Sequence, residues 1–194
     1  RPDGPRRMLM VTDPAQVLHD RGFRVPAPDD GWTVCELVTN CRNSQQIARI
    51  LRTKLDGAAS PMSGPEAVDV RHVAVPVGDT DAVVTAVGAE LNRLLDDEER
   101  DPTSVAVLTF RSVVRDALRD APGLDLVRWE DRADGVLGEN VHRVKGLEHD
   151  TVILVSDRAE EPDDLLYVGV SRAVSELIVV SPEAVASRLG LRRS

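Results

Sequence analysis

The fold is decided by two apolar runs near the C-terminal end, Val152-Ile153-Leu154-Val155 and Leu177-Ile178-Val179-Val180. Every position in each run is apolar, so both faces of each run must be covered, as expected of buried parallel strands. Residues 164–173 lie between the two runs and predict a helix. A strand, a helix and a second strand form a βαβ unit, whose two strands lie parallel in one sheet.

The same alternation of apolar runs and helical patterns extends back toward the N-terminus. We expect a buried strand at residues 105–108 and further strand candidates at 8–11 and 34–37. A period-two pattern from Val68 to Val77 predicts an edge strand or a strand end, because Pro76 cannot donate to a sheet ladder. The sequence therefore predicts an α/β fold with a mainly parallel sheet and helices on both faces. The expected helices begin after Asn43 or Ser44, at Asp79 or Thr80, near Val113 and at Pro182.

Composition excludes several classes of protein. The net charge of −9 argues against a nucleic-acid binder that is basic over its whole surface, but it allows a local groove that grips a strand. Cys35 and Cys41 are the only cysteines, and without a His or Cys partner their spacing does not form a zinc pattern. No apolar run is long enough to cross a bilayer, and no signal peptide is visible. We therefore expect reduced thiols and a cytoplasmic location.

Polar segments beside the predicted strands are the expected place for a ligand. In open parallel sheets, ligands bind in the crevice beyond the carboxyl ends of the strands. This rule places three segments near one crevice, namely the residues after Val11, those after Leu37 and those around Lys145.

Four short segments carry the chemistry. They are VTDPAQ at residues 11–16, LVTNCRNS at 37–44, NVHRVKGLE at 140–148 and YVGVSRA at 167–173. In this order they resemble the motifs G-D-x-x-Q, L-x-x-N-Y-R-S/N, T-x-H-x-x-K-G-L-E and Y-V-A/G-x-T/S-R-A of superfamily 1 helicases of the UvrD/Rep type. The resemblance implies a RecA-like fold, with residues 1–30 as a remnant of the end of the first RecA-like lobe and residues 31–194 as the second lobe.

The resemblance also implies that two arginines serve an ATP site. Arg42 and Arg172 would stabilise the charge that spreads over the γ-phosphoryl oxygens, and an arginine finger of this kind contributes roughly 10³–10⁵ in rate. Gln16 would sense the γ-phosphate or position the attacking water, and Asp13 would steady the turn. From the residues alone, both arginines could also be surface or salt-bridging residues, and Asp13 could close a strand in an Asx turn.

The third motif would contact both the nucleotide and the nucleic acid. By resemblance, Glu148 would accept a hydrogen bond from a ribose hydroxyl, and Gly146 would allow close approach of the backbone. Lys145 and His142 would meet a nucleic-acid phosphate or support the nucleotide crevice. The alternatives are an i,i+3 ion pair between Lys145 and Glu148 and a structural role for His142. Cys41 stands where the family has an aromatic that stacks on adenine, and a thiol cannot replace the face of a ring.

The phosphate-cradling loop is missing. No G-x-x-x-x-G-K-S/T occurs in the chain, and no acidic pair at a strand end suggests a metal site. The resemblance therefore implies that ATP and Mg²⁺, the expected cofactors, are held mainly by a first lobe outside this chain. The chain begins with Arg1 rather than Met, as expected of a piece cut from a longer protein.

These observations predict the C-terminal lobe of an ATP-dependent UvrD-like DNA helicase or translocase. The expected partners are single-stranded DNA, or RNA, and the N-terminal helicase lobe of the same parent; no membrane partner is expected. The isolated chain should not hydrolyse ATP.

One alternative is a degenerate lobe that regulates or binds partners in a nucleic-acid-processing protein, which Cys41 and the 3% aromatic content favour. The other is a self-sufficient nucleotide-binding α/β protein, which would need the missing loop.

Overall fold

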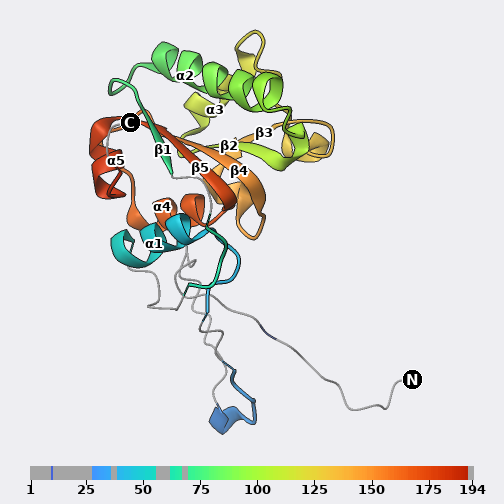
Figure 1. Ribbon diagram of the computed structural model, residues 1–194, viewed down its shortest axis with the longest axis vertical. Helices are drawn as coiled ribbons and strands as arrows, with labels where there is room; N and C mark the ends of the chain where they lie inside the picture. Colours follow the sequence, from blue (N-terminus) through green and yellow to red (C-terminus); the bar gives the residue numbers. More distant parts are fainter. Residues whose placement is uncertain (1–9, 11–27, 36–38, 56–61, 67–69, 192–194) are drawn as a thin grey trace.

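The chain forms one sheet with helices on both of its faces (Figure 1). The computed structural model describes residues 10, 28–35, 39–55, 62–66 and 70–191. Within these ranges the sheet has five strands in the order β1-β5-β4-β2-β3, and every neighbouring pair is parallel. The strands are β1 (Arg71–Ala74), β2 (Val105–Thr109), β3 (Leu137–Asn140), β4 (His149–Val155) and β5 (Ala173–Ser181).

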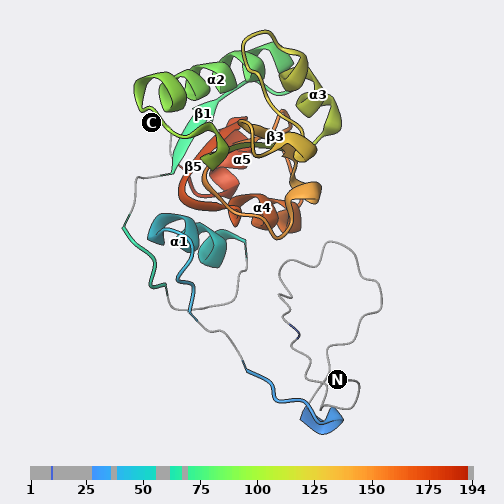
Figure 2. The same ribbon diagram turned by 90° about the vertical axis from the view of Figure 1, so that its right-hand side faces the viewer.

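The helices lie in two groups, one on each face of the sheet (Figures 1 and 2). The first group is α1 (Gln45–Lys54), α4 (Asp163–Val170) and α5 (Glu183–Arg188), and the second is α2 (Thr80–Asn92) and α3 (Ser112–Asp120). None of the described helices combines the length and the apolar character that crossing a membrane requires. Short helical turns complete the described chain: η2 (Pro28–Asp30), η3 (Arg93–Asp97), η4 (Pro102–Ser104), η5 (Trp129–Asp131) and η6 (Val141–Val144).

The central strands supply side chains to two separate cores. In β4, Val152 and Leu154 pack with α1, α4 and α5, whereas Ile153 and Val155 pack with α2 and α3. This division follows from the strand geometry, because successive side chains point to opposite faces. Each fully buried aliphatic side chain contributes about 1.5–3 kcal/mol. Both faces of the predicted apolar runs are therefore covered, and the predicted α/β fold with a parallel sheet is confirmed.

Most of the predicted elements are present, with some changed boundaries. β2, β4 and β5 contain the predicted buried runs, and β1 is the edge strand expected before Pro76. The helix expected over 164–173 ends at Val170, because Ala173 already begins β5. The helix expected at Pro182 begins at Glu183, with Pro182 at the N-cap position.

One predicted strand is wrong where it can be judged, and one observed strand is not predicted. Val34 and Cys35 are exposed to solvent and belong to no strand, so these apolar side chains do not contribute to the core. The rest of that candidate, residues 36 and 37, lies outside the described residues, as do residues 8, 9 and 11 of the first candidate. The unpredicted strand is β3, whose sequence LGEN contains few strand-forming residues.

Helix α4 lies against β4 with no room for a side chain at Gly169. A Cβ atom there would lie 2.7 Å from Leu154 Cδ1 and 3.4 Å from Val141 Cγ2. A larger residue would have to displace Leu154 or the helix, because a close-packed core has little free volume. Gly169 therefore sets the distance between α4 and the sheet.

Candidate functional site

Two of the motif segments meet where β4 and β5 begin. Glu148 directly precedes β4, and Arg172 directly precedes β5. The two strands are parallel neighbours, and the backbone N–H of His149 donates to the Arg172 carbonyl at 3.0 Å. We call this place the amino edge, meaning the residues at the amino ends of β4 and β5.

A third motif segment is fixed to the same edge by Asn43. Its side-chain amide is buried and donates to the Ala173 carbonyl at 2.6 Å, and the backbone N–H of Ser44 donates to the Val174 carbonyl at 2.7 Å. The Asn40 side chain accepts from the backbone N–H groups of Arg42 (3.1 Å) and Asn43 (3.2 Å), which forms a local Asx-type turn. Arg42 therefore projects from a backbone that is held beside the first residues of β5.

Arg42 and Glu148 form an ion pair across the amino edge. The Nη1 atom of Arg42 lies 2.7 Å from Oε1 of Glu148, although the residues are 106 positions apart in the sequence. Their side chains are 39% and 43% exposed, so both can be reached from solvent. Among the described ion pairs, Glu148 is joined to Arg42 and not to Lys145, the partner that the i,i+3 alternative would require.

Arg172 turns inward behind this pair. The residue is 1% exposed, and its Nε atom donates to the Val168 carbonyl at 3.1 Å. Its two Nη atoms donate to the Leu147 carbonyl and to Ser171 Oγ, both at 2.9 Å. Arg172 thus joins the last turn of α4 to the loop that carries Glu148. The prediction that it also meets a phosphate stays a prediction.

The remaining predicted site residues differ in backbone conformation and in exposure to solvent. Gly146 has a φ of +88°, a left-handed conformation that favours glycine, and a Cβ atom there would meet nothing within 4 Å. Lys145 and His142 are exposed, and His142 lies in η6. Cys41 is an exposed free thiol. Asp13 and Gln16 lie outside the described residues.

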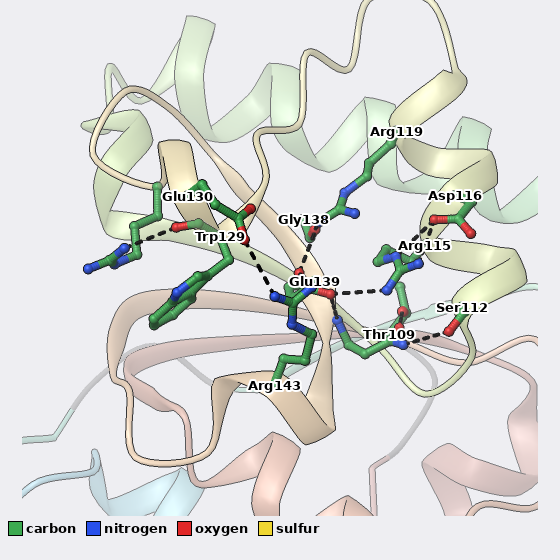
Figure 3. A network of polar contacts seen from close by, with 12 residues as sticks. Thr109, Ser112, Arg115, Asp116, Arg119, Trp129, Glu130, Gly138, Glu139 and Arg143 are labelled. Carbon is green, nitrogen blue, oxygen red and sulfur yellow. Dashed lines mark hydrogen bonds and ion pairs between the residues drawn. The ribbon is translucent and has the colours of Figure 1, made fainter.

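A buried carboxylate holds the segment that leads to the amino edge (Figure 3). Glu139 is 0% exposed and accepts from the Asn140 backbone N–H at 2.9 Å. Arg115 and Arg119 of α3 approach it at 3.2 and 3.1 Å, and Arg143 of η6 at 3.3 Å. We call these residues the Glu139 cluster. It fastens α3 and η6 to β3, and Arg143 stands next to the predicted nucleic-acid contact His142.

The Glu139 carboxyl stays ionised in spite of its burial. Burial alone would raise its pKa, but the hydrogen bond from the Asn140 N–H and the charges of Arg119 and Arg143 outweigh burial and lower the pKa. The cluster therefore consists of charged groups, and the carboxylate compensates arginines that are themselves partly buried.

The site lies at the other end of the sheet from the one expected. The rule for open parallel sheets placed the residues after Leu37 and around Lys145 beyond the carboxyl ends of the strands. That expectation is wrong for Arg42 and Glu148, which lie with Arg172 at the amino edge. The reason is that both later motifs precede their buried strands in the sequence. The segment after Val11 lies outside the described residues.

Sequence reasoning named Asn43 only as a possible N-cap and missed its anchoring role. The family pattern holds Ser or Asn at this position, which was an available signal. Gly64 was also missed, and a Cβ atom there would lie 2.0 Å from the Asn43 carbonyl oxygen. Glu139 was missed as well, because a lone glutamate in the sequence gives no sign that Arg115 and Arg119, 24 and 20 positions away, will join the nearby Arg143 around it.

Comparisons with known proteins show which family model and which solved structures this chain resembles. Residues 138–180 match the family model for the UvrD-like helicase C-terminal domain, a range that includes Glu148 and Arg172. The fold is similar to the crystal structure of the C-terminal domain of a possible DNA helicase from Lactobacillus plantarum WCFS1. That similarity has a TM-score of 0.57 and 26% identity, and it covers 77% of this chain and 91% of the other.

Two further comparisons do not bear on the family or the function of this chain. A similarity to arterivirus nonstructural protein 10, a helicase, has a TM-score of 0.40 and 15% identity over 77% of this chain and 26% of that one, which is too low to carry an argument. No curated protein matches the chain. The family match and the Lactobacillus structure together confirm the resemblance that the four motifs indicated: this chain is similar to the C-terminal domain of UvrD-like helicases.

Proposed function

We propose that this lobe completes the ATP site of an ATP-dependent DNA helicase or translocase, and that Arg42 is the cation that it brings to the nucleotide. The observation that carries the proposal is the meeting of three motif segments at the amino edge, with Arg42 exposed beside Glu148. A guanidinium there can approach a phosphoryl group that a facing lobe holds and donate hydrogen bonds to its oxygens.

The residues of the amino edge fit part of a nucleotide. Arg42 offers donors to phosphate oxygens, and Glu148 offers an acceptor for a ribose hydroxyl. Among the described residues, no group of three or more His, Cys, Asp or Glu side chains could hold a metal ion. ATP would supply the transferable phosphoryl group, and both ATP and Mg²⁺ would be held mainly by the facing lobe. Gln16, from the segment that ends that lobe, would sense the γ-phosphate or position the attacking water, and Asp13 would steady the turn.

Arg172 serves the same edge from inside in this proposal. Its guanidinium already donates to acceptors that include the Val168 and Leu147 carbonyls and Ser171 Oγ, and a direct phosphate contact would require it to leave acceptors of this kind. We therefore assign the first contact with the γ-phosphoryl group to Arg42, and to Arg172 the positioning of the Glu148 loop. Lobe closure that exposes Arg172 would make it a second finger, as the family resemblance implies.

The test uses the parent protein with both lobes and measures its ATPase rate with and without single-stranded DNA. Arg42→Ala should lower the stimulated kcat by roughly a thousandfold or more, the range known for arginine fingers. Arg52→Ala is the matched control, because Arg52 is an exposed arginine on the neighbouring helix α1. An unchanged kcat in the Arg42 variant would refute the assignment.

The nucleic-acid path is assigned to His142 and Lys145, which are exposed beside the Glu139 cluster. If Lys145 contacts a phosphate, Lys145→Ala should weaken binding to all single strands alike and reduce the magnitude of the salt slope by about one. The measurement is fluorescence anisotropy of a labelled oligonucleotide, as DNA and as RNA, over a range of salt concentrations. An unchanged slope would remove Lys145 from the path.

Cys41 favours a second candidate, a degenerate lobe that regulates a nucleic-acid-processing protein. Its exposed thiol stands where the family stacks an aromatic on adenine, so the grip on the base should be weak. A parent whose ATPase is not stimulated by single strands, and is insensitive to Arg42→Ala, would support this candidate.

A further inference from the structure

We propose that Glu148 competes with phosphate for Arg42, so that the lobe alone presents a partly neutralised cation and a phosphoryl group binds Arg42 by taking the carboxylate's place. The inference rests on the proposed function, because it takes the amino edge to be the face that meets a nucleotide. It assigns to Glu148 a second role, separate from acceptance of a ribose hydroxyl.

The first support is the charge balance of the pair. At 2.7 Å the Glu148 carboxylate accepts from Nη1 of Arg42, one of the donors that a phosphate oxygen would use. Both side chains are more than a third exposed, and an ion pair in that setting is weak, typically worth 0–1 kcal/mol. A phosphoryl group carries more charge and more acceptor oxygens than a carboxylate, so it can displace Glu148.

The second support is that both backbones are fixed while both side chains can turn. Arg42 follows the Asn40 turn and precedes Asn43, which is anchored to β5. Glu148 stands between Leu147, whose carbonyl accepts from Arg172, and His149, whose N–H donates to the Arg172 carbonyl directly before β5. The exchange therefore needs only side-chain rotations at the surface, which take picoseconds to nanoseconds, and no rearrangement of the fold.

The experiment measures binding of inorganic triphosphate to the 194-residue chain by isothermal calorimetry. This probe has no ribose, so it separates competition for Arg42 from the ribose contact. Glu148→Gln should tighten binding about twofold to fivefold, the range that loss of an exposed ion pair allows. Adding Arg42→Gln to that variant should remove the gain.

The matched control is Asp163→Asn, which makes the same change in net charge. Asp163 is a similarly exposed carboxylate paired with Arg188, and it lies at the start of α4. An equal gain in this variant would attribute the effect to net charge and overturn the proposal. Unchanged or weaker binding by the Glu148 variant overturns it too, as does the absence of binding by every variant at millimolar triphosphate.

The ATPase of the parent separates this inference from the proposed function. If Arg42→Ala lowers kcat while Glu148→Gln leaves triphosphate binding unchanged, the competition is wrong and the assignment of Arg42 stands. If Arg42→Ala leaves kcat unchanged, both are wrong. With ATP in place of triphosphate, the gain from Glu148→Gln should be smaller, because that variant also alters the acceptor offered to the ribose.

Discussion

The Glu139 cluster and the Arg42–Glu148 pair are both made of arginine and glutamate, yet their surroundings give them different capacities. The Glu139 carboxylate is fully buried and shared among three arginines, whereas the Glu148 carboxylate is exposed and is joined to Arg42. A buried charge cannot lose its partners without a large desolvation cost, but an exposed one can turn to water. The first arrangement therefore holds the fold, and the second is free to exchange partners.

The largest expected effect on stability comes from removing the buried Glu139 carboxylate. Glu139→Ala leaves Arg115 and Arg119 without their shared carboxylate and should reduce the free energy of unfolding by about 3 kcal/mol. Urea denaturation followed by circular dichroism measures the change. Glu130→Ala is the control, since Glu130 is 65% exposed and 3.6 Å from Arg143, and it should change stability little. Equal effects in the two variants would contradict the distinction drawn from burial.

Arg172 tests whether an inward-facing arginine behaves like the buried cluster. Arg172→Gln deprives the buried Val168 carbonyl and the partly buried Leu147 carbonyl of charged donors, so we expect a loss of about 2 kcal/mol in the free energy of unfolding. Arg188→Gln, which removes a half-exposed arginine from its pair with Asp163, should change stability by less than about 0.5 kcal/mol. If the Arg172 variant is as stable as the wild type, Arg172 is not structural and its assignment as a finger regains support.

The contribution of the ionised Glu139 carboxylate to stability should be visible in the pH dependence of the free energy of unfolding. Its folded-state pKa lies below its unfolded-state value, so its contribution is complete at neutral pH and above that value, which is about 4.3. The contribution is lost as the pH falls through the folded-state pKa. Urea midpoints measured from pH 7 to pH 3 should therefore fall more steeply for the wild type than for Glu139→Gln. Parallel curves would mean that Glu139 titrates no differently in the two states.

The exposed pair should show the smallest effect on stability. Arg42→Gln and Glu148→Gln are each expected to change the free energy of unfolding by less than about 0.5 kcal/mol. Thermal and urea denaturation of the two variants provide the measurement. A loss of 2 kcal/mol in either one would make the pair a structural element, and exchange with a phosphate would then be too costly.

The sequence was sufficient for the parts of the fold that depend on local pattern. Runs that are apolar at every position identified β2, β4 and β5, because a strand buried on both faces requires such a run. β3 was not predicted, since its stability depends on β2 and on arginines of α3 and η6 rather than on its own residues. Partners that are distant in the sequence leave no local signal.

The sequence predicted which residues form the site, but it did not predict all of their positions. The four motifs named Arg42, Glu148 and Arg172, and the structure brings the three together at one edge of the sheet. The burial of Arg172 could not be foreseen, because it depends on the carbonyls that α4 and the Glu148 loop happen to offer. The end of the sheet could have been foreseen from the order of motif and strand.

The strand order also determines when this domain can be completed during synthesis. β1 pairs with β5 alone within the described sheet, and its residue Ala74 stands opposite Ser181. The ribosome must therefore add more than a hundred residues after β1 before its partner exists, and contacts of such long range slow folding. The anchoring of Asn43 to Ala173 has the same requirement. The segment that carries Arg42 should be among the last to settle, and pulse proteolysis of stalled nascent chains should find it sensitive until residue 181 has left the exit tunnel.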